Sequence, residues 1–311
     1  MIVLQPVEDA DEETSVLYAL HQPPSKLGHV SLDVRIEFNI AGQDYIVSQR
    51  PEYTLAGKGV TGGVVWSSTP LVLEMLLQLQ HTPLKCIPRQ GNLTSRKSID
   101  LTLDPQRSLV LELGSGGTGL AALVLAQHAK LFIASDFDPE LLRQLSKHCC
   151  TRDDVGKRVK IQRREAIDED ESKLSKQRRD NIRVLELNWE DDFATQVKPS
   201  IVSLLAEEKR ALHDDDDEPS KVDYVLCLDC VYSSYLLVHL VSTVAAILKL
   251  YPDCKAILGQ QLRDQFVHLE FIEQLLARGL LVHRLEEDDD DASSAAMQAL
   301  DGYAIYIVSN T

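Results

Sequence analysis

The stretch that most constrains the fold of this chain runs from Leu109 to Asp138, LVLELGSGGTGLAALVLAQHAKLFIASDFD. It begins with a short apolar run, which is followed by glycines at positions 114, 116, 117 and 119. An apolar segment of helical length spans 120–129, and a second short apolar run, 131–134, leads to Asp136. This order predicts a strand, a glycine-rich turn, a helix, a second strand and a terminal acid, which together start an α/β fold.

The same stretch suggests a binding site for a nucleoside. Glycines let the backbone approach a ligand without a Cβ in the way, and the following helix begins with free N–H groups. An acid at the end of the second strand can accept hydrogen bonds from a ribose diol. The alternative is a tight strand–helix turn in an α/β protein that binds no ligand.

Two details favour S-adenosylmethionine (AdoMet) over a dinucleotide. The spacing Gly114-x-Gly116-x-x-Gly119 also fits NAD-binding folds and is weak evidence alone. However, Glu112 stands two residues before the first glycine, and the resulting Glu-x-Gly-Ser115-Gly pattern is the usual form in AdoMet enzymes. No second nucleotide-binding unit follows downstream. We therefore predict AdoMet as the cofactor.

Composition narrows the class of protein. The 311 residues are 44% hydrophobic, and no segment is long and apolar enough to cross a bilayer. The first residues, MIVLQPVEDADEE, lack a basic region and an apolar signal core, so we expect a cytoplasmic protein, with the nucleus as an alternative. The six cysteines include a lone Cys227-x-x-Cys230 without a second pair, which predicts reduced thiols and no metal site.

The net charge of −16 bears on partners. It argues against direct binding to nucleic acid or an anionic membrane, because phosphate contacts need basic patches. A basic protein partner suits this charge, although acidic surfaces also simply promote solubility. We expect a monomer.

The N-terminal part is predicted to contain a β-hairpin and little other regular structure. Residues 1–30 show little periodicity and are expected to be loosely packed, whereas 31–38 and 45–48 flank a turn and predict a β-hairpin. We place a domain boundary there, with an N-terminal extension at 1–56 and the main domain at 57–311.

A helix is predicted from Leu71 onward, with Pro70 in its first turn and a serine or threonine at 67–69 as its cap. Trp66 stands just before it. A lone tryptophan usually packs in the core, but the preceding Gly-Gly pair would suit a segment that covers a ligand.

Further elements follow the nucleoside stretch. The charged segment 151–180 predicts an exposed insertion, and the acidic run 214–218, within 191–221, predicts a solvated loop. The remaining predicted elements are helices at 139–148, 233–250 and 263–277 and strands at 182–187, 222–228, 256–259, 280–285 and 303–308.

Polar and aromatic residues follow two of these strands. Asn188 and Trp189 come after the strand at 182–187, and in open α/β sheets ligands bind at the carboxyl ends of strands. We expect the amide to contact the adenine edge and the indole to pack beside the ring. Asp229-Cys230-Val231-Tyr232 follows the strand that ends at Leu228.

Together these motifs resemble the seven-β-strand protein lysine methyltransferases with an Asp-x-x-Tyr motif, the methyltransferase-like 21 group. The matching blocks are GGVVW, LELGSGGTGL, the Ser-Asp pair that ends at position 136, LNWE and DCVY. The phrases VVWSSTPLVLEMLL, LDCVYSSYLL and GQQLRDQ are most similar to the fungal ribosomal lysine methyltransferase branch. The resemblance covers roughly residues 57–311.

The resemblance implies a Rossmann-like, seven-stranded class I AdoMet-dependent methyltransferase fold with an antiparallel last strand. It implies methylation of a lysine in a basic, ribosomal protein. Asn188 departs from the aspartate usual in this family, but its carbonyl oxygen still accepts hydrogen bonds. The implied cofactor contacts lie at Trp66, Gly114, Ser115, Gly116, Asp136, Trp189 and Leu228.

Asp229 and Tyr232 would face the methyl group and the incoming amine. Asp229 could orient the substrate ammonium, and Tyr232 could hydrogen-bond its nitrogen. For Asp229 the alternative is a cap on the next helix; for Tyr232 it is packing in the pocket. Two other functions also remain open: a nonenzymatic AdoMet-fold scaffold for a basic partner, and a methyltransferase for small molecules or nucleic acid. The charge and the absence of Asn-Pro-Pro-Tyr at 229–232 disfavour nucleic acid.

Overall fold

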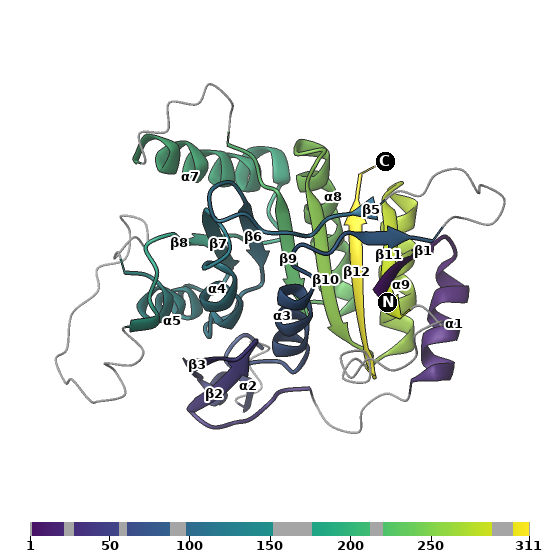
Figure 1. The fold of residues 1–311 in the computed structure, drawn as a ribbon, viewed down its shortest axis with the longest axis horizontal. Coiled ribbons are helices and arrows are strands. Elements are labelled where there is room, and N and C mark those ends of the chain that lie inside the picture. The colour runs from purple at the N-terminus through teal and green to yellow at the C-terminus, as the bar shows by residue number, and fades with distance from the viewer. Residues whose placement is uncertain are drawn as a thin grey trace. The chain divides into compact units, whose positions relative to one another are not determined.

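The computed structural model describes residues 2–21, 28–55, 61–87, 98–151, 176–211, 220–287 and 301–310 (Figure 1). It forms two compact units, each of mixed α/β structure. Unit 1 comprises Met1–Gly28, Ser67–Leu103 and Tyr224–Thr311, and unit 2 comprises His29–Trp66 and Asp104–Asp223. Each unit is a group of segments with many contacts among themselves, and neither unit begins or ends at residue 56. The domain boundary expected after residue 56 therefore stays a prediction.

Unit 2 is built on three parallel strands. Strand β7 pairs with β6 on one side and β8 on the other, and β6 and β7 are buried along their whole length. Burial of nearly every position is typical of parallel strands covered on both faces. The elements are β6 (Leu109–Leu113), α4 (Leu120–Leu125), β7 (Leu131–Asp136), α5 (Pro139–Cys149) and β8 (Ile182–Glu186).

Helix α4 ends four residues earlier than the sequence predicts. The carbonyl oxygens of Ala126 and Ala129 both accept hydrogen bonds from the Asn181 side chain, at 2.7 and 2.8 Å. These bonds satisfy carbonyl groups at the end of α4 without further helical turns. A contact 52 residues or more away in sequence thus fixes this helix end.

The hairpin of unit 2 consists of β2 (Arg35–Ile40) and β3 (Gln43–Ser48). Its two turn residues, Ala41 and Gly42, have φ angles of 50° and 78°. Positive φ at both central positions is the geometry that matches the twist of two antiparallel strands. The hairpin contacts α4, where Gln127 donates a hydrogen bond of 2.6 Å to the Tyr45 hydroxyl, and the short helix α2 (Pro51–Leu55) follows.

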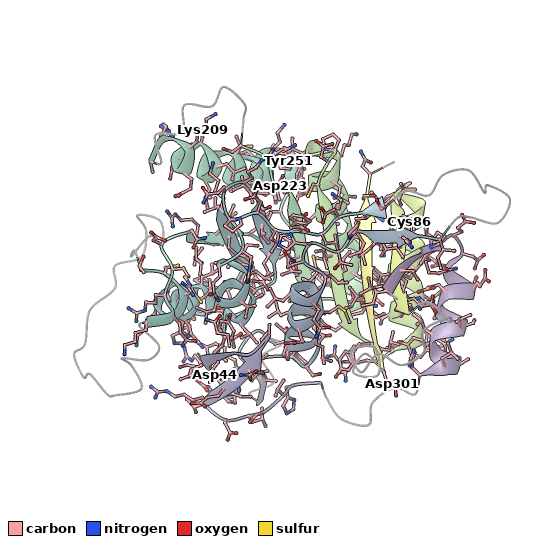
Figure 2. All side chains as sticks on the ribbon, viewed as in Figure 1. Asp44, Cys86, Lys209, Asp223, Tyr251 and Asp301 are labelled. Carbon is pink, nitrogen blue, oxygen red and sulfur yellow. The ribbon has the colours of Figure 1, made fainter. Side chains whose placement is uncertain are left out.

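A helical segment that the sequence analysis did not anticipate precedes the acidic run. It comprises the π-helical turn η1 (Phe193–Val197) and α7 (Lys198–Ala211), and Lys209 is labelled in its last turn in Figure 2. The Asp192 side chain caps it by accepting from Thr195 N at 2.9 Å, and Ile201 and Leu205 are buried four residues apart. Most of the predicted insertion at 151–180 and the whole acidic run 214–218 lie outside the described residues.

An ion pair between Arg183 of β8 and Glu208 of α7 joins these elements. The guanidinium donates from Nε and Nη2 to the two carboxylate oxygens, and the two side chains are only 7% and 14% exposed. Arg183→Met should lower the free energy of unfolding by roughly 3–5 kcal/mol, because it leaves Glu208 buried without its partner. Adding Glu208→Leu should recover most of the loss in urea unfolding; a single variant as stable as the wild type would contradict this.

Unit 1 contains a mixed sheet in which β10 pairs parallel with β9, and β12 pairs antiparallel with both β10 and β11. The antiparallel last strand is therefore as predicted. Strands β1, β4 and β5 extend the sheet beyond β11, and the sequence analysis did not predict them. The order is β5 (Ser98–Ile99), β4 (Leu84–Cys86), β1 (Ile2–Val7), β11 (Leu281–Glu287), β12 (Tyr303–Ser309), β10 (Lys255–Gln261) and β9 (Tyr224–Leu228).

The expectation that residues 1–30 are loosely packed is wrong. Strand β1 pairs with β11 and β4, and α1 (Ala10–Leu20) packs beside α9 (Gln265–Ala277), as Figure 1 shows. The buried face of α1 carries Glu13 and Thr14. Glu13 accepts from the Tyr306 hydroxyl at 2.8 Å, and Thr14 Oγ1 bonds His268 at 3.0 Å. Because this face is partly polar, the hydrophobic pattern does not reveal the helix.

The described residues of unit 1 also form α3 (Ser68–Gln78), which packs on β9 and β10, and α8 (Ser234–Leu250), which packs on β10 and α9. Ser67 is the N-cap residue of α3 but makes no side-chain cap bond; its hydroxyl accepts from Tyr303 at 2.8 Å instead. The six cysteines all lie in described residues and form no disulfide there. In the described part of the chain, no helix has the length and apolar character needed to span a membrane.

Candidate functional site

The glycine-rich turn leaves the end of β6 with three residues in the left-handed region. Gly114, Gly116 and Gly119 have φ angles of 72°, 61° and 66°, which non-glycine residues adopt only at a cost. A Cβ on Gly116 would lie 2.6 Å from the carbonyl oxygen of Gly62. Ser115 N donates to the Ser135 carbonyl at 2.8 Å, which ties the turn to the end of β7. Glycine is thus required here by backbone geometry and by close packing.

Asp136 joins the turn directly. Its carboxylate accepts from the backbone N–H of Gly116 at 3.0 Å, Phe137 at 2.8 Å and Asp138 at 3.1 Å. Burial raises the pKa of this carboxyl, and the three N–H donors oppose that rise. A carboxylate has about four acceptor positions, so three donors leave room for a hydroxyl group such as that of a ribose.

Glu112, on β6, is the most perturbed acid of this cluster. The residue is 4% exposed, and burial raises the pKa of its carboxyl to about 7; Ser115 opposes the rise, and Asp136 adds to it. Its Oε2 atom has no hydrogen-bond partner among the described residues. A buried acceptor without a donor costs free energy that a ligand carrying N–H groups could recover. The acceptor oxygens of Glu112 and Asp136 therefore fit AdoMet, which bears both an amine and a ribose.

The raised pKa of Glu112 predicts a pH dependence of stability. Because the pKa rises from 4.5 to about 7 on folding, stability is lost as pH increases between these two values. At about 1.4 kcal/mol per pKa unit, the full loss is roughly 3 kcal/mol, reached above pH 7. Glu112→Gln removes the ionisation, so it should be more stable than the wild type at pH 8 but not at pH 4.

Urea unfolding of both proteins at the two pH values measures this difference. Glu186→Gln, which replaces an exposed glutamate of β8, is the control for loss of a carboxylate in the same unit. A Glu112→Gln protein whose stability relative to wild type is the same at both pH values would contradict the prediction.

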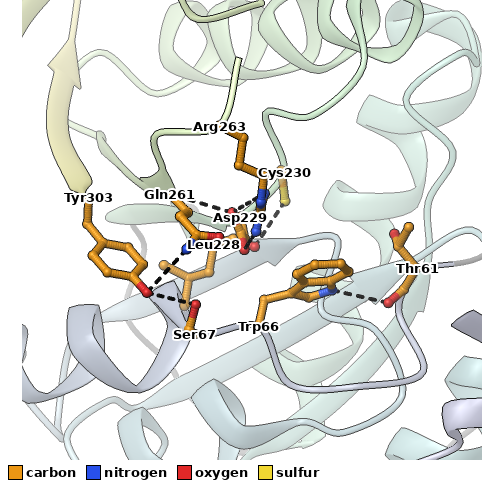
Figure 3. A network of polar contacts seen from close by, with 9 residues as sticks. All are labelled: Thr61, Trp66, Ser67, Leu228, Asp229, Cys230, Gln261, Arg263 and Tyr303. Atoms are coloured by element: carbon orange, nitrogen blue, oxygen red, sulfur yellow. Dashed lines mark hydrogen bonds and ion pairs between the residues drawn. The ribbon is translucent and has the colours of Figure 1, made fainter. Parts of the chain in front are cut away.

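The segment 61–66 packs onto the glycine-rich turn. Gly117 N donates to the Gly62 carbonyl at 2.8 Å, and a Cβ on Gly62 would lie 2.9 Å from Gly116 Cα. Trp66 is half-buried; its indole N–H donates to the Thr61 carbonyl at 3.1 Å, as Figure 3 shows, and its ring meets His29 edge-on. Of the Gly-Gly pair, Gly62 thus lies on the turn and Gly63 packs against Arg50, whereas cofactor contact by Trp66 stays a prediction.

Asn188 and Trp189 follow β8 in the same unit. Leu187 N donates to the Asp136 carbonyl at 2.9 Å, so this segment starts beside the acid. The side-chain oxygen of Asn188 accepts from Glu190 N at 3.1 Å and closes a local turn. Trp189 is half-buried. Their contacts to adenine stay predictions.

Asp229, in unit 1, sits directly after β9 in a constrained position. Its φ angle is 57°, its N–H donates to the Gly259 carbonyl at 2.7 Å, and its side chain has no exposed surface. Figure 3 shows its carboxylate bonded by both ends of the Arg263 guanidinium, at 2.8 Å from Nη1 and 2.5 Å from Nη2. Gln261 N also donates to Oδ1 at 3.3 Å. The alternative of a helix cap is wrong, because Ser233 is the cap residue of α8.

Arg263 and Gln261 were not predicted as parts of this cluster. Gln261 is buried at the end of β10, and its amide approaches the Tyr303 hydroxyl at 3.5 Å. The strand order could have revealed them. Because β10 runs parallel to β9, residues that follow the two strands meet at one edge of the sheet. Arg263 follows β10 by two residues, much as Asp229 follows β9.

The other predicted residues of unit 1 differ in exposure. Leu228 is 7% exposed and belongs to the buried face of β9, whereas Tyr232 is 39% exposed. Cys227 and Cys230 are both buried, and the Cys230 thiol donates to the Leu228 carbonyl at 3.5 Å. The role of Leu228 at the cofactor and that of Tyr232 at the amine stay predictions.

The structure therefore brings the predicted residues together within each unit. In unit 2 the backbone of the turn and the carboxylate of Asp136 are bonded to each other, and Glu112 lies in the same cluster. In unit 1 Asp229 joins two residues that were not predicted. The first cluster fits a nucleoside ligand, and the second contains a buried carboxylate held by a guanidinium.

Comparisons with known proteins bear on this arrangement. No protein-family model matches the chain. The ribosomal lysine N-methyltransferase 5 of Vanderwaltozyma polyspora is 28% identical over 236 residues, covering 70% of this chain and 66% of that protein. The protein of the same name from Eremothecium gossypii is 27% identical over 241 residues, covering 72% and 68%. The resemblance to this group is confirmed.

A third relative has a different name. The diaminohydroxyphosphoribosylamino-pyrimidine deaminase of Schizosaccharomyces pombe is 28% identical over 274 residues, which cover 88% of this chain. The chain spans about half of that protein (52%) and about two thirds of the two methyltransferases. Among solved structures, a putative SAM-dependent methyltransferase from Streptococcus mutans aligns with a TM-score of 0.43 at 9% identity, covering 89% of this chain and 55% of that one.

Proposed function

We propose that this protein is an AdoMet-dependent protein-lysine N-methyltransferase that acts on a ribosomal protein. The observation that carries the proposal is the cluster of unit 2, where the glycine-rich turn, Asp136 and Glu112 converge. The relatives named as ribosomal lysine methyltransferases support the reaction and the substrate class.

The cofactor role falls to residues of unit 2. We assign the ribose hydroxyls to Asp136 and the amine to Glu112, whose Oε2 atom otherwise has no donor. Gly114, Ser115 and Gly116 would offer their backbone, and Trp66, Asn188 and Trp189 are proposed at the adenine and sulfonium ends on the resemblance. When bound, AdoMet supplies a methyl group that is already activated, so the protein has to bind and orient.

The substrate role falls to Asp229 and Tyr232. A lysine amine with a pKa near 10.4 is charged at neutral pH and has to lose a proton before it can attack. We propose that the carboxylate of Asp229 accepts a hydrogen bond from the nitrogen and fixes its direction, and that the Tyr232 hydroxyl adds a second contact. Directional constraint of this kind accounts for a large part of the rate gain in reactions between two bound groups.

The proposed substrate also suits the charge of the chain. Ribosomal proteins are basic, and opposite net charges speed encounter at low ionic strength. With a net charge of −16, the protein is matched to a basic protein partner rather than to bare RNA. We place this activity in the cytoplasm and in a monomer.

The experiment is methyl incorporation from labelled AdoMet into an extract and into purified ribosomal proteins from cells that lack the enzyme. Mass spectrometry then maps the label. A single methylated lysine supports the proposal. Label on arginine, a terminal amine, RNA or a small molecule overturns the lysine assignment. AdoMet binding without any transfer would favour a nonenzymatic scaffold.

The deaminase relative suggests a second activity, which the contacts in unit 1 disfavour. Zinc-dependent nucleobase deaminases use a His-x-Glu and a Cys-x-x-Cys as ligands and general acid. The chain holds both patterns, at His268–Glu270 and Cys227–Cys230. However, both ring nitrogens of His268 bond hydroxyls, Nδ1 to Thr14 at 3.0 Å and Nε2 to Tyr306 at 2.8 Å. A histidine engaged in this way is part of the packing between α1, α9 and β12.

A further inference from the structure

Arg263 is the principal partner of Asp229 and controls how its carboxylate is presented. The fork places one guanidinium nitrogen on each carboxylate oxygen, at 2.8 and 2.5 Å (Figure 3). Such bidentate pairs fix the plane of the carboxylate. The Asp229 side chain has no exposed surface, whereas that of Arg263 is 21% exposed. Because the carboxylate is fully covered here, a substrate nitrogen reaches it only after a covering side chain moves, and the guanidinium then sets the direction of its remaining acceptor position.

The surrounding backbone holds the pair in place. Asp229 lies in the left-handed region of backbone conformation. Its N–H donates to Gly259 O, and its Oδ1 accepts from Gln261 N. A Cβ on Gly28 would lie 2.7 Å from Arg263 Nη2 and 1.8 Å from Gln261 Oε1. The backbone of Gly28 therefore lies against the guanidinium, and a residue with a side chain at this position would clash with Arg263 and Gln261.

The pair also changes the electrostatic role of Asp229. The carboxylate and the guanidinium together have little net charge, so the pair does not act as a bare anion that attracts any cation. The carboxylate remains a directional acceptor, because two oxygens offer about four acceptor positions and the described donors occupy three. Such a group orients a nitrogen better than it captures an ammonium ion.

We propose that Arg263 is a positioning residue that aims the Asp229 carboxylate at the substrate nitrogen. This rests on the proposed function, in which Asp229 orients the amine. Arg263 acts through Asp229 and touches neither substrate nor cofactor. Its loss should therefore lower kcat for methyl transfer by at least tenfold, with KM for the protein substrate and Kd for AdoMet changed less than threefold.

The test compares Arg263→Met, Arg263→Lys and Arg263→Ala with wild type in the same methyl-transfer assay, with thermal unfolding and AdoMet calorimetry as measures of folding. Lysine keeps the charge but not the fork, so it should remain well below wild type. Guanidinium chloride at millimolar concentration should restore part of kcat to Arg263→Ala, which leaves space for it, and not to Arg263→Met. Gly28→Ala, which crowds both Gln261 Oε1 and Arg263 Nη2 without removing a charge, should give a smaller loss of kcat than Arg263→Ala.

Arg284→Met is the matched control, because Arg284 is paired with the buried Glu13 in the same unit. It should lower stability while leaving kcat unchanged. Full kcat in folded Arg263→Met overturns the proposal, and so does a gain in kcat/KM, which would make Arg263 a competitor of the substrate. Wild-type protein that transfers no methyl group overturns the proposed function itself, before any variant is compared.

Discussion

Asp229→Asn is expected to lower the turnover of methyl transfer by at least about 100-fold while AdoMet binding changes little. The substitution keeps the size of the side chain and removes its charge, so the nitrogen of the substrate loses a strong directional acceptor. It also replaces one acceptor oxygen of the Arg263 fork by an amide that cannot accept. The expected pattern is a fall in kcat with nearly unchanged Kd for AdoMet, as for a group that acts on the second substrate.

A loss of stability could mimic this result, so the control matters. Glu13→Gln changes another buried carboxylate of unit 1 that pairs with an arginine, Arg284, at 2.8 Å. It should reduce stability comparably and leave kcat unaffected. Calorimetry with AdoMet, urea unfolding and initial rates on the mapped substrate give the three quantities. An Asp229→Asn protein with full activity would remove Asp229 from the reaction and leave the substrate class open.

Gly116→Ala is expected to abolish measurable AdoMet binding and to destabilise the protein strongly. A non-glycine residue in the left-handed region costs about 1–2 kcal/mol. The new Cβ would in addition lie 2.6 Å from the Gly62 carbonyl oxygen and 3.1 Å from its Cα, so backbone has to move. Overpacking of this kind costs about 1–3 kcal/mol more. The N–H of residue 116, which bonds Asp136, would shift with the turn.

Gly42→Ala separates the two contributions. Gly42 has a φ angle of 78° and lies in the hairpin turn of the same unit, but a Cβ there meets no atom within 4 Å. It should therefore show the conformational cost alone and keep wild-type affinity for AdoMet. Urea unfolding and calorimetry measure both proteins. Equal losses of unfolding free energy in the two variants would show that the contact with Gly62 contributes nothing to stability. Wild-type AdoMet affinity in Gly116→Ala would remove the turn from the cofactor site.

Local sequence patterns predicted most of the elements from residue 109 onward. The strands of both units that were expected in this part form within a few residues of their predicted bounds. Helices α5, α8 and α9 likewise follow apolar periodicity and turn signals close to their ends. Each of these features depends on neighbouring residues, which a pattern can register.

The elements that were missed have other causes. Helix α1 buries Glu13 and Thr14, so its inner face lacks the expected apolar stripe. Helix α7 has an apolar stripe at Ile201 and Leu205. It was not predicted because the segment was assigned to a solvated loop together with the adjacent acidic run 214–218. Strand β1 gains its place from pairing with β11 and β4. Whether such a segment forms a strand depends on partner strands that are distant in sequence, because the stability of a strand depends on the residues packed beside it.

For the candidate site, the sequence by itself determined the residue types that the backbone needs. Positive φ at Gly114, Gly116 and Gly119, and an acid at the end of β7, follow from local geometry. Only the tertiary structure decided the state of the polar groups. It pairs Asp229 with Arg263, 34 residues later, and it buries Glu112 so that its pKa rises to about 7. The reason is physical: backbone conformation depends on adjacent residues, whereas charge pairing and desolvation depend on which strands and turns the fold brings into contact.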